Sequence, residues 1–310
     1  MNYNVLINLI YNAEKPDFRK ISNISLAFSK IIKNDIINSS KKKDFFKSVE
    51  SVAKVHVNLK QRMDLTKESL TGFIKIYEKD IALNSPLVCG LGATHVLETS
   101  LTLHHIWGIP YIPGSSLKGV CRKVAFWKLV EEKNLQNEND INELQKKFYG
   151  DLAYNDTKIL TYQLLFGAQD FKGILTFLDV YPDTSTNDGK IFRLDIMNPH
   201  YSSYYSDDSG ETPPGDWENP IPIFFLTVKE GVKFRFVVLF DNYRWKKIKE
   251  NGLYITNEEG KKEKVNIPSN EIEQLTKDNK FLEGILKQAL ETYGLGSKTR
   301  LGYGSFRVQN

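Results

Sequence analysis

The stretch GLGSKTRLGYGSF, residues 294–306, carries four glycines and two basic residues close to the end of the chain. Glycines can take positive φ angles and let the backbone approach a ligand closely, and Lys298 and Arg300 bring charge to the same loop. The spacing fits neither a Walker loop nor a GxGxxG motif. The residues therefore leave two readings open, a loop that holds phosphates or a plain glycine turn before a last strand at 305–308.

The segment before this glycine loop (residues 294–304) predicts a helix over 271–293. Its apolar residues recur with a period near 3.6 and form one stripe, made of Leu282, Ile285, Leu286, Ala289, Leu290 and Tyr293. The loop thus follows directly on a helix that packs against a core.

A second motif, GIPYIPGSSLKG at residues 108–119, leads into another predicted helix. Pro113 and Gly114 end a strand, and Ser115 or Ser116 can cap the helix that follows. Lys118 and Arg122 lie four residues apart, on the face expected to be opposite the apolar stripe. Free amide groups at the helix start would attract an anion, although an ordinary capped helix with two solvated basic residues explains the pattern equally well.

The remaining pattern predicts an α+β protein. Helical spacing covers residues 17–37 and 44–78, a break follows at 84–86, and alternating apolar residues between 96 and 103 indicate a strand. Further strands are expected at 174–180 and in a hairpin formed by 221–228 and 233–240. From residue 85 the predicted order is strand, helix, strand, strand, helix, strand, which is the ferredoxin-like (RRM-like) βαββαβ pattern.

We therefore expect a helical N-terminal region, residues 1–84, packed on a ferredoxin-like domain at 85–310. Polar, turn-rich insertions are expected around 131–158, 182–220 and 246–268. The longest apolar runs are far shorter than the roughly 20 residues of a membrane span. The first residues do not form a secretion signal, so a soluble, cytoplasmic protein is expected.

Charge and cysteine usage exclude some classes of site. Net charge is +4, but residues 1–80 hold 15 Lys and Arg against 9 Asp and Glu, and the rest of the chain 27 against 29. The run of lysines at 41–43 suits a solvated loop better than a phosphate site. Cys89 and Cys121 are expected to be buried free thiols. His104 and His105 would point to opposite faces of a strand, so we expect no metal site.

The segment MNPHYSSYY, residues 197–205, gathers one histidine and three tyrosines in the long insertion. The rings of Tyr201, Tyr204 and Tyr205 could stack on unpaired bases or could anchor the loop to a protein surface. His200 is the best candidate for a general acid or base, because it lies in the most polar setting of the histidines.

Together these motifs resemble the RAMP superfamily of CRISPR-associated RNA-binding proteins. The GIPYIPGSSLKG and GLGSKTRLGYGSF motifs are similar to those of several RAMP subunits. RLDIMNPHYSSYY (residues 193–205), followed by PPGD at 213–216 and PIPIFFLTV at 220–228, resembles the sixth subunit of the type III-B, or Cmr, effector complex. The resemblance covers roughly residues 85–308.

The resemblance implies a structural subunit without catalytic activity or cofactor, which holds the 3′ part of a guide RNA (crRNA) and caps a filament of RAMP subunits. Its partners would be guide and target RNA, the backbone RAMP subunits, a small helical subunit and another terminal RAMP subunit, with no membrane. Because guide sequences vary, contacts to the RNA backbone are expected. The residues expected to bind RNA are Gly114, Ser115, Ser116, Lys118, Arg122, Gly294, Gly296, Ser297, Lys298, Thr299, Arg300, Gly302, Tyr303 and Gly304.

His200, Tyr201, Tyr204 and Tyr205 are expected to contact either RNA or a neighbouring subunit. The rival hypothesis is a metal-independent endoribonuclease that processes guide RNA, as some members of the same superfamily do. In that case His200 would act as the general base, and Tyr201 or Lys298 would stabilise the developing charge.

Overall fold

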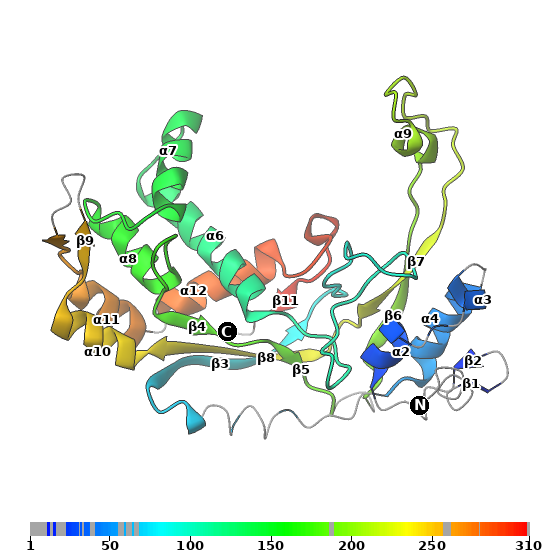
Figure 1. The fold of residues 1–310 in the computed structure, drawn as a ribbon, viewed down its shortest axis with the longest axis horizontal. Helices are drawn as coiled ribbons and strands as arrows, with labels where there is room; N and C mark the ends of the chain where they lie inside the picture. The colour runs from blue at the N-terminus through cyan, green and yellow to red at the C-terminus, as the bar shows by residue number, and fades with distance from the viewer. Residues whose placement is uncertain are drawn as a thin grey trace.

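The computed structural model has a central antiparallel sheet with helices on one face and a long projecting hairpin at one end (Figure 1). The described residues are 11–12, 15–16, 23–30, 32, 34–37, 41–54, 59, 64, 68–185, 189–256, 262–278 and 280–308. No helix in these ranges is both long and apolar enough to cross a bilayer.

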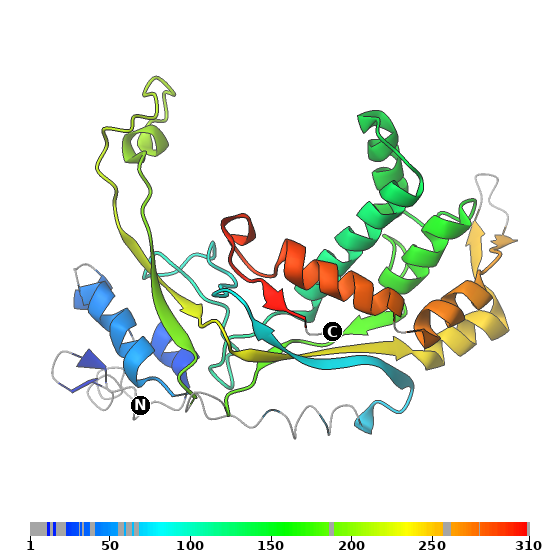
Figure 2. The same cartoon turned by 180° about the vertical axis from the view of Figure 1, so that it is seen from behind.

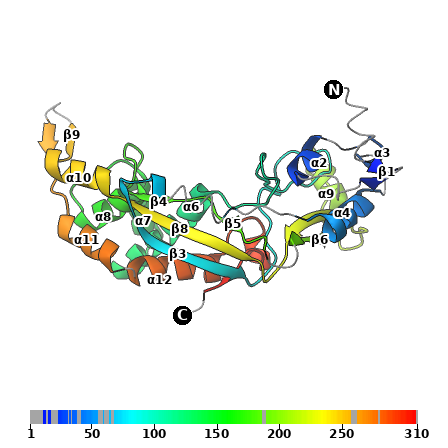
Figure 3. The same ribbon diagram turned by 90° about the horizontal axis from the view of Figure 1, so that it is seen from below.

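The central sheet is antiparallel and runs in the order β11-β3-β8-β4, with β5 pairing β8 farther along the same edge. Its two long strands, β3 and β8, are neighbours in the sheet. Figure 3 shows them from the side of the sheet that the helices do not cover. The strands are β3 (Phe73–Leu83), β4 (Leu175–Phe177), β5 (Tyr181–Pro182), β8 (Lys233–Asp241) and β11 (Phe306–Arg307).

Helices from two distant parts of the chain cover this sheet (Figures 1 and 2). They are α6 (Gly114–Glu132), α7 (Glu138–Tyr149), α8 (Thr157–Phe166) and α12 (Lys280–Gln288), which continues into a π-helical turn at Ala289–Tyr293. The order β3, α6, β4, β8, α12, β11 is β-α-β-β-α-β, which is consistent with the predicted ferredoxin-like pattern. The α+β class is confirmed.

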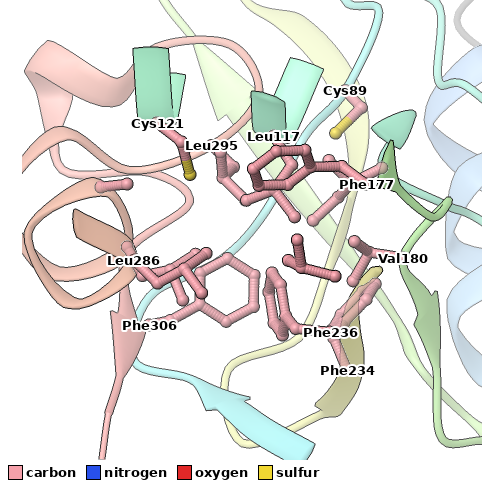
Figure 4. Packing of buried hydrophobic residues seen from close by; sticks show 14 of the residues in the cluster. Cys89, Leu117, Cys121, Phe177, Val180, Phe234, Phe236, Leu286, Leu295 and Phe306 are labelled. Carbon is pink, nitrogen blue, oxygen red and sulfur yellow. The ribbon is translucent and has the colours of Figure 1, made fainter. Parts of the chain in front are cut away.

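The core lies between this sheet and α6 and α12 (Figure 4). Leu117 and Cys121 of α6 and Leu286 of α12 point toward phenylalanines of the sheet, and all three are fully buried. Phe306 meets Phe234 and Phe236 edge to face, with ring centroids 5.9 and 5.1 Å apart. Such pairs stabilise a fold by about 1 kcal/mol beyond their area burial, so the last strand is firmly held.

The strand expected near residues 96–103 is absent, and this prediction is wrong. Residues 84–113 form turns with three isolated bridges, Leu87 to Val228, Leu103 to Pro110 and Ile112 to Val180. Gly90, Glu98 and Gly108 have positive φ angles, which break an extended chain. The first strand of the sheet is instead β3, so the helical region expected to reach residue 84 ends before Phe73.

The expected hairpin of 221–228 with 233–240 is also wrong. The strand β7 (Ile223–Val228) pairs with β6 (Phe192–Met197), while β8 pairs with β3, β4 and β5. β8 follows β7 directly in the chain, but Gly231, at a φ of 82°, turns the chain into a different sheet. The partners of each strand are therefore decided by packing and not by the short connection.

The described N-terminal helices pack on the β6–β7 pair at the end far from α10 (Figure 1). They are α2 (Ile24–Lys30), α3 (Asn34–Ile37) and α4 (Lys41–Val52), with a small pair β1 (Tyr11–Asn12) and β2 (Lys15–Pro16). Glu50 of α4 accepts a hydrogen bond of 3.1 Å from the amide of Leu194. The lysines at 41–43 begin α4 and are not in a loop, and Lys42 pairs with Glu98 at 2.6 Å.

The opposite end of the sheet carries α10 (Asn242–Asn251), α11 (Ser269–Lys277), β9 (Tyr254–Thr256) and β10 (Lys262–Lys264). The helix predicted over 271–293 is split between α11 and α12, and it ends at Tyr293 as expected. Five of the six residues of its predicted apolar stripe are buried, and Tyr293 is partly buried.

Candidate functional site

The glycine loop and the start of α6 lie together and line one open pocket of about 440 Å³. Pro113 and Ser116 form one side of it, and residues 293–297 with Thr299 form the other. The two motifs are about 180 residues apart in the chain. The structure therefore brings together the two turns that the sequence singled out.

The conformation of the glycine loop is fixed by hydrogen bonds to the preceding turn region. The amide of Ser297 donates to the carbonyl of Val88 at 2.7 Å, and the amide of Gly304 donates to Pro86 at 2.8 Å. The amide of Leu295 donates to the carbonyl of Gly304 at 2.9 Å, which closes the loop. The buried Leu295 side chain points into the core beneath it (Figure 4). The base of the loop is thus rigid, and these amides are not free for a ligand.

Three glycines of the two motifs are needed for contacts inside the protein. A Cβ on Gly304 would lie 1.8 Å from the carbonyl oxygen of Leu295, and one on Gly296 would lie 2.4 Å from that of Val88. A Cβ on Gly114 would lie 2.2 Å from the carbonyl oxygen of Phe177. The backbone approach that we attributed to a ligand is, at these three positions, an approach to another part of the chain.

The tip of the loop is exposed and positively charged. Lys298 (φ 58°) and Gly302 (φ 88°) both take left-handed conformations on either side of a 3₁₀ turn at Thr299–Leu301. Arg300 and Gly302 are exposed, and Lys298 is partly exposed. Across the described ranges, neither Lys298 nor Arg300 forms an ion pair. Their charges remain available to an anion outside the protein.

The start of α6 differs from the prediction in one respect. The helix begins at Gly114 after Pro113, and no serine side chain caps it. Instead Asp179, which follows β4, accepts the amide hydrogen of Gly114 at 2.7 Å. A carboxylate of the protein therefore satisfies the first amide of the helix, where we expected an external anion. Ser115 and Ser116 are exposed, and Ser116 lines the pocket.

Lys118 and Arg122 do not face the pocket. At 100° per residue, Ser116, Val120 and Lys123 lie within about 60° of one another around the helix, whereas Lys118 is about 200° from Ser116. Burial, followed by the charges of Arg122, Lys172 and Arg244, lowers the pKa of Lys118. These four basic side chains form a separate group on the other side of α6.

Arg122 is engaged within the protein. Its guanidinium donates to the carbonyl of Phe148 at 3.1 Å and lies 4.6 Å from the centre of the Tyr149 ring, so it ties α6 to the end of α7. Burial is the main cause of its lowered pKa. The expectation that Arg122 points away from the packed face is wrong, because α7 covers that side of the helix.

Lys123 is a basic residue of the pocket that the sequence analysis missed. It is exposed, its ammonium lies 5.0 Å from the centre of the Tyr293 ring, and it follows Ser116 by seven residues, or about two helical turns. The helical period, applied from Ser116, could have identified it.

The turn region before α6 also contributes unexpectedly to the pocket. Cys89, Gly90 and Thr102 line it. Both cysteines are buried free thiols, as predicted, and burial raises the pKa of Cys89 to about 12. The thiol is thus a neutral part of the wall. No sequence signal marked this region, because the turns that place it depend on contacts with the glycine loop.

Tyr303 and the tyrosine cluster lie away from the pocket. The Tyr303 hydroxyl donates to Asp195 of β6 at 3.0 Å, and burial followed by this bond raises its pKa. Tyr201, Tyr204 and Tyr205 belong to residues 198–222, which we call the arm and which connect β6 to β7 around the short helix α9 (Ser202–Ser206). The arm projects on the same side of the sheet as α7 (Figures 1 and 2).

His200 lies on the arm as well, and not beside Lys298 of the glycine loop. It is exposed, and its ring lies near that of Tyr201, with centroids 6.4 Å apart. Of the two residues proposed to assist His200 in the endoribonuclease hypothesis, the structure thus places Tyr201 next to it and Lys298 on a different loop.

Two further histidines, His104 and His105, contact each other in the turn region before α6. His104 and His105 stack on each other at 5.1 Å, because they lie in a turn; the expectation that a strand would separate them is wrong. The described part of the chain contains no group of three His, Cys, Asp or Glu side chains placed to hold a metal ion.

Comparison with known proteins gives consistent matches. The chain is 32% identical over 251 residues to a Cmr system subunit, Cmr6, of Pyrococcus furiosus, covering 71% of this chain and 64% of that protein. It is 24% identical over 194 residues to Cmr6 of Saccharolobus solfataricus, covering 62% of this chain and 53% of the relative. The matches span less than two thirds of the length of either relative.

A similar fold occurs in a chain of a solved cryo-EM structure, that of the type III-B Cmr-beta complex bound to cognate target RNA. The TM-score is 0.56, with 20% sequence identity, and the match covers 99% of this chain and 87% of that one. The family model described as the RAMP superfamily matches residues 80–307, which include the end of β3, the other strands of the central sheet, α6 and the glycine loop. The chain therefore belongs to the RAMP superfamily.

Proposed function

We propose that this chain is a non-catalytic, RNA-binding structural subunit of a type III-B CRISPR effector complex. It would hold the 3′ part of the guide RNA and occupy the end of a filament of RAMP subunits in a cytoplasmic ribonucleoprotein. The Cmr6 relatives and the fold of the Cmr-beta chain support the assembly role. The observation that carries the RNA role is that both glycine-bearing turns line one open pocket.

The chemistry of the pocket suits a sugar-phosphate chain. Lys123 lines it, Lys298 and Arg300 lie on the adjoining tip of the glycine loop, and none of the three forms an ion pair across the described ranges. Hydroxyls of Ser116, Ser297 and Thr299 add short donors. Charged groups and hydroxyls of this kind recognise phosphates without reading bases, as a variable guide requires. Lys118 remains a predicted contact on the other side of α6.

The test is RNA binding by the purified chain carrying Lys298→Ala with Arg300→Ala. Two guide-length single-stranded RNAs of unrelated sequence serve as probes, titrated at several salt concentrations. The variant should bind both RNAs more weakly by a similar factor, on the order of tenfold, and its salt slope should fall by about 1.4, or about 0.7 per lost contact.

The matched control is Lys246→Ala with Lys247→Ala, which removes the same charge from exposed positions of α10 at the far end of the sheet. It should leave the slope unchanged. A slope that is the same in the loop variant and in the unmodified chain would contradict the proposal. Cleavage of repeat RNA in EDTA that is lost on His200→Ala would support an endoribonuclease instead.

A further inference from the structure

The arm combines strong negative charge with exposed aromatic rings. Residues 198–222 contain five acidic residues and no lysine or arginine; the acids are Asp207, Asp208, Glu211, Asp216 and Glu218. Large rings are nevertheless exposed at its end: Tyr205 is 73% exposed and Trp217 is 80% exposed. Exposed rings grouped on one projection are a mark of an interaction surface.

The arm is held in shape before any partner binds. The hydroxyl of Tyr201 donates to Asp216 at 3.0 Å, and Glu218 accepts from the amide of Ser203 at 2.9 Å, so the outgoing and returning chains are joined near the tip. The amide of Ile221 donates to the carbonyl of Pro199 at 3.2 Å at the base. A preorganised surface loses less conformational entropy when it binds.

Hydrogen bonds also keep two carboxylates of the arm in their ionised form. Asp207 accepts from the hydroxyl of Ser209 at 2.5 Å and from the amide of Thr212 at 2.6 Å, and these bonds lower its pKa. The pKa of Glu218 is lowered chiefly by its bond from Ser203. Both carboxylates are therefore charged at neutral pH.

This charge opposes RNA binding. Proteins that stack aromatic rings on single-stranded bases place those rings along positively charged grooves. Here, each ring lies within a segment that carries only acidic charges, and phosphates approaching within about 8 Å would be repelled. The sequence left two partners open for the tyrosine cluster, RNA or a neighbouring subunit. The negative charge of the arm favours the protein partner.

We propose that the arm docks on a different protein chain, at an apolar pocket that receives Tyr205 and Trp217 and is bordered by lysine or arginine. Tyrosine and tryptophan are the residues that most often dominate binding at such interfaces, and complementary charge around them steers association. The proposal rests on the assembly role above, with the partner being a neighbouring subunit.

The test replaces Tyr205 by the photo-crosslinking residue p-benzoylphenylalanine in the full chain, assembled with guide RNA and the subunits encoded with it. A matched probe at Tyr243 of α10, 64% exposed, reports on the opposite end. Irradiation should join position 205, and not position 243, to a peptide of another subunit that contains lysine or arginine. Cross-links to RNA, to a second copy of this chain alone, or to nothing would each overturn the proposal.

A second variant tests the charge. Asp208→Lys with Glu211→Lys reverses two exposed charges, and it should reduce the cross-link from position 205 several-fold, as should raising the salt from about 0.1 M to about 1 M. Glu131→Lys with Glu132→Lys on α6 is the matched control and should have no effect. An unchanged cross-link in the arm variant would also overturn the proposal.

A measurement of RNA binding distinguishes the proposal for the arm from the proposal that the pocket binds RNA. The purified arm variant Tyr205→Ala with Trp217→Ala, which removes the exposed rings and leaves the charge unchanged, should lose no RNA affinity, whereas the Lys298 and Arg300 variant should lose it. Loss in the arm variant would place RNA on the arm and contradict the inference. Loss in neither variant would contradict the RNA role of the pocket while leaving the cross-linking result to decide on the arm.

Discussion

The glycine loop and the arm are both connections that project from the same side of the sheet (Figure 2), but they are held in different ways. The loop is fixed by bonds to residues about 200 positions earlier, such as that from Gly304 to Pro86, and by Leu295 in the core. The arm is fixed by bonds between residues at most about 20 positions apart, such as that from Tyr201 to Asp216. Changes in the loop should therefore affect the whole fold, and changes in the arm should remain local.

The glycine loop and the arm also differ in the side chains that they present. The loop presents basic side chains and hydroxyls around a pocket, while the arm presents carboxylates around aromatic rings. One protein surface can thus face RNA at one place and a protein at another, because the two places carry charge of opposite sign. Three measurements of stability would test this contrast.

The largest difference is expected between two glycines with similar φ angles, Gly304 at 70° and Gly210 of the arm at 73°. An added Cβ meets the carbonyl oxygen of Leu295 at 1.8 Å in the first case and nothing within 4 Å in the second. Gly304→Ala should lower the free energy of unfolding by about 3 kcal/mol or more, and Gly210→Ala by about 1 kcal/mol. Urea denaturation measures both, and equal losses would show that the loop is not anchored as described.

A smaller difference is expected between two arginines. Arg235 of β8 donates to both oxygens of Asp80 on β3, at 2.9 and 3.1 Å, and its side chain is 16% exposed. Arg193 of β6, at the end of the β6–β7 pair away from the arm, pairs with Glu230, with side chains 42% and 58% exposed.

Arg235→Ala should cost about 1 to 3 kcal/mol of unfolding free energy, because carboxylates of the sheet lose a charged donor. Arg193→Ala should cost about 0.5 kcal/mol or less, as water screens an exposed pair. Thermal melts at low and high salt check this prediction. A larger loss for Arg193 would mean that the β6–β7 pair, from which the arm extends, carries more of the stability than the central sheet does.

The smallest effect on stability is expected from lowering the pH. Burial lowers the pKa of His95, which stacks on Phe28 at 4.6 Å, so the unfolded chain binds a proton more readily than the folded one. Stability contributed by the neutral ring is present above the unfolded pKa of about 6.5 and is lost as the pH falls below it.

His95→Asn should therefore weaken the decline of the melting temperature between pH 7.5 and about pH 5.5. The pKa of Asp207 in the arm is also lowered, so its contribution to stability is likewise lost as the pH falls, but only below its unfolded pKa of about 3.8, outside this window. Asp207→Asn should leave the melting curve over the same window unchanged. A steeper decline in the His95 variant would contradict the assignment.

The sequence predicted local elements well where one segment determines its own structure. The period of 3.6 identified α6 and α12, whose apolar stripes are formed by residues within a few turns of one another. The prediction from sequence failed where the structure of a segment depends on contacts with residues distant in the chain. The apolar residues between 96 and 103 alternate like a strand, yet Leu97 and Leu101 are buried within turns. Alternating apolar residues indicate that one side of a segment is buried, and a segment made of turns can be buried on one side as well.

What the sequence alone determined is the class of the protein and its two glycine motifs, because composition, helical period and turn residues act over a few positions. Only the tertiary structure decided that Ser116 and Lys123 join the glycine loop while Lys118 and Arg122 turn away. It also decided that β7 pairs with β6 and carries an acidic arm away from the pocket. The physical reason is that strand partners, and the face that a helix presents, are chosen by the free energy of packing surfaces distant in the chain.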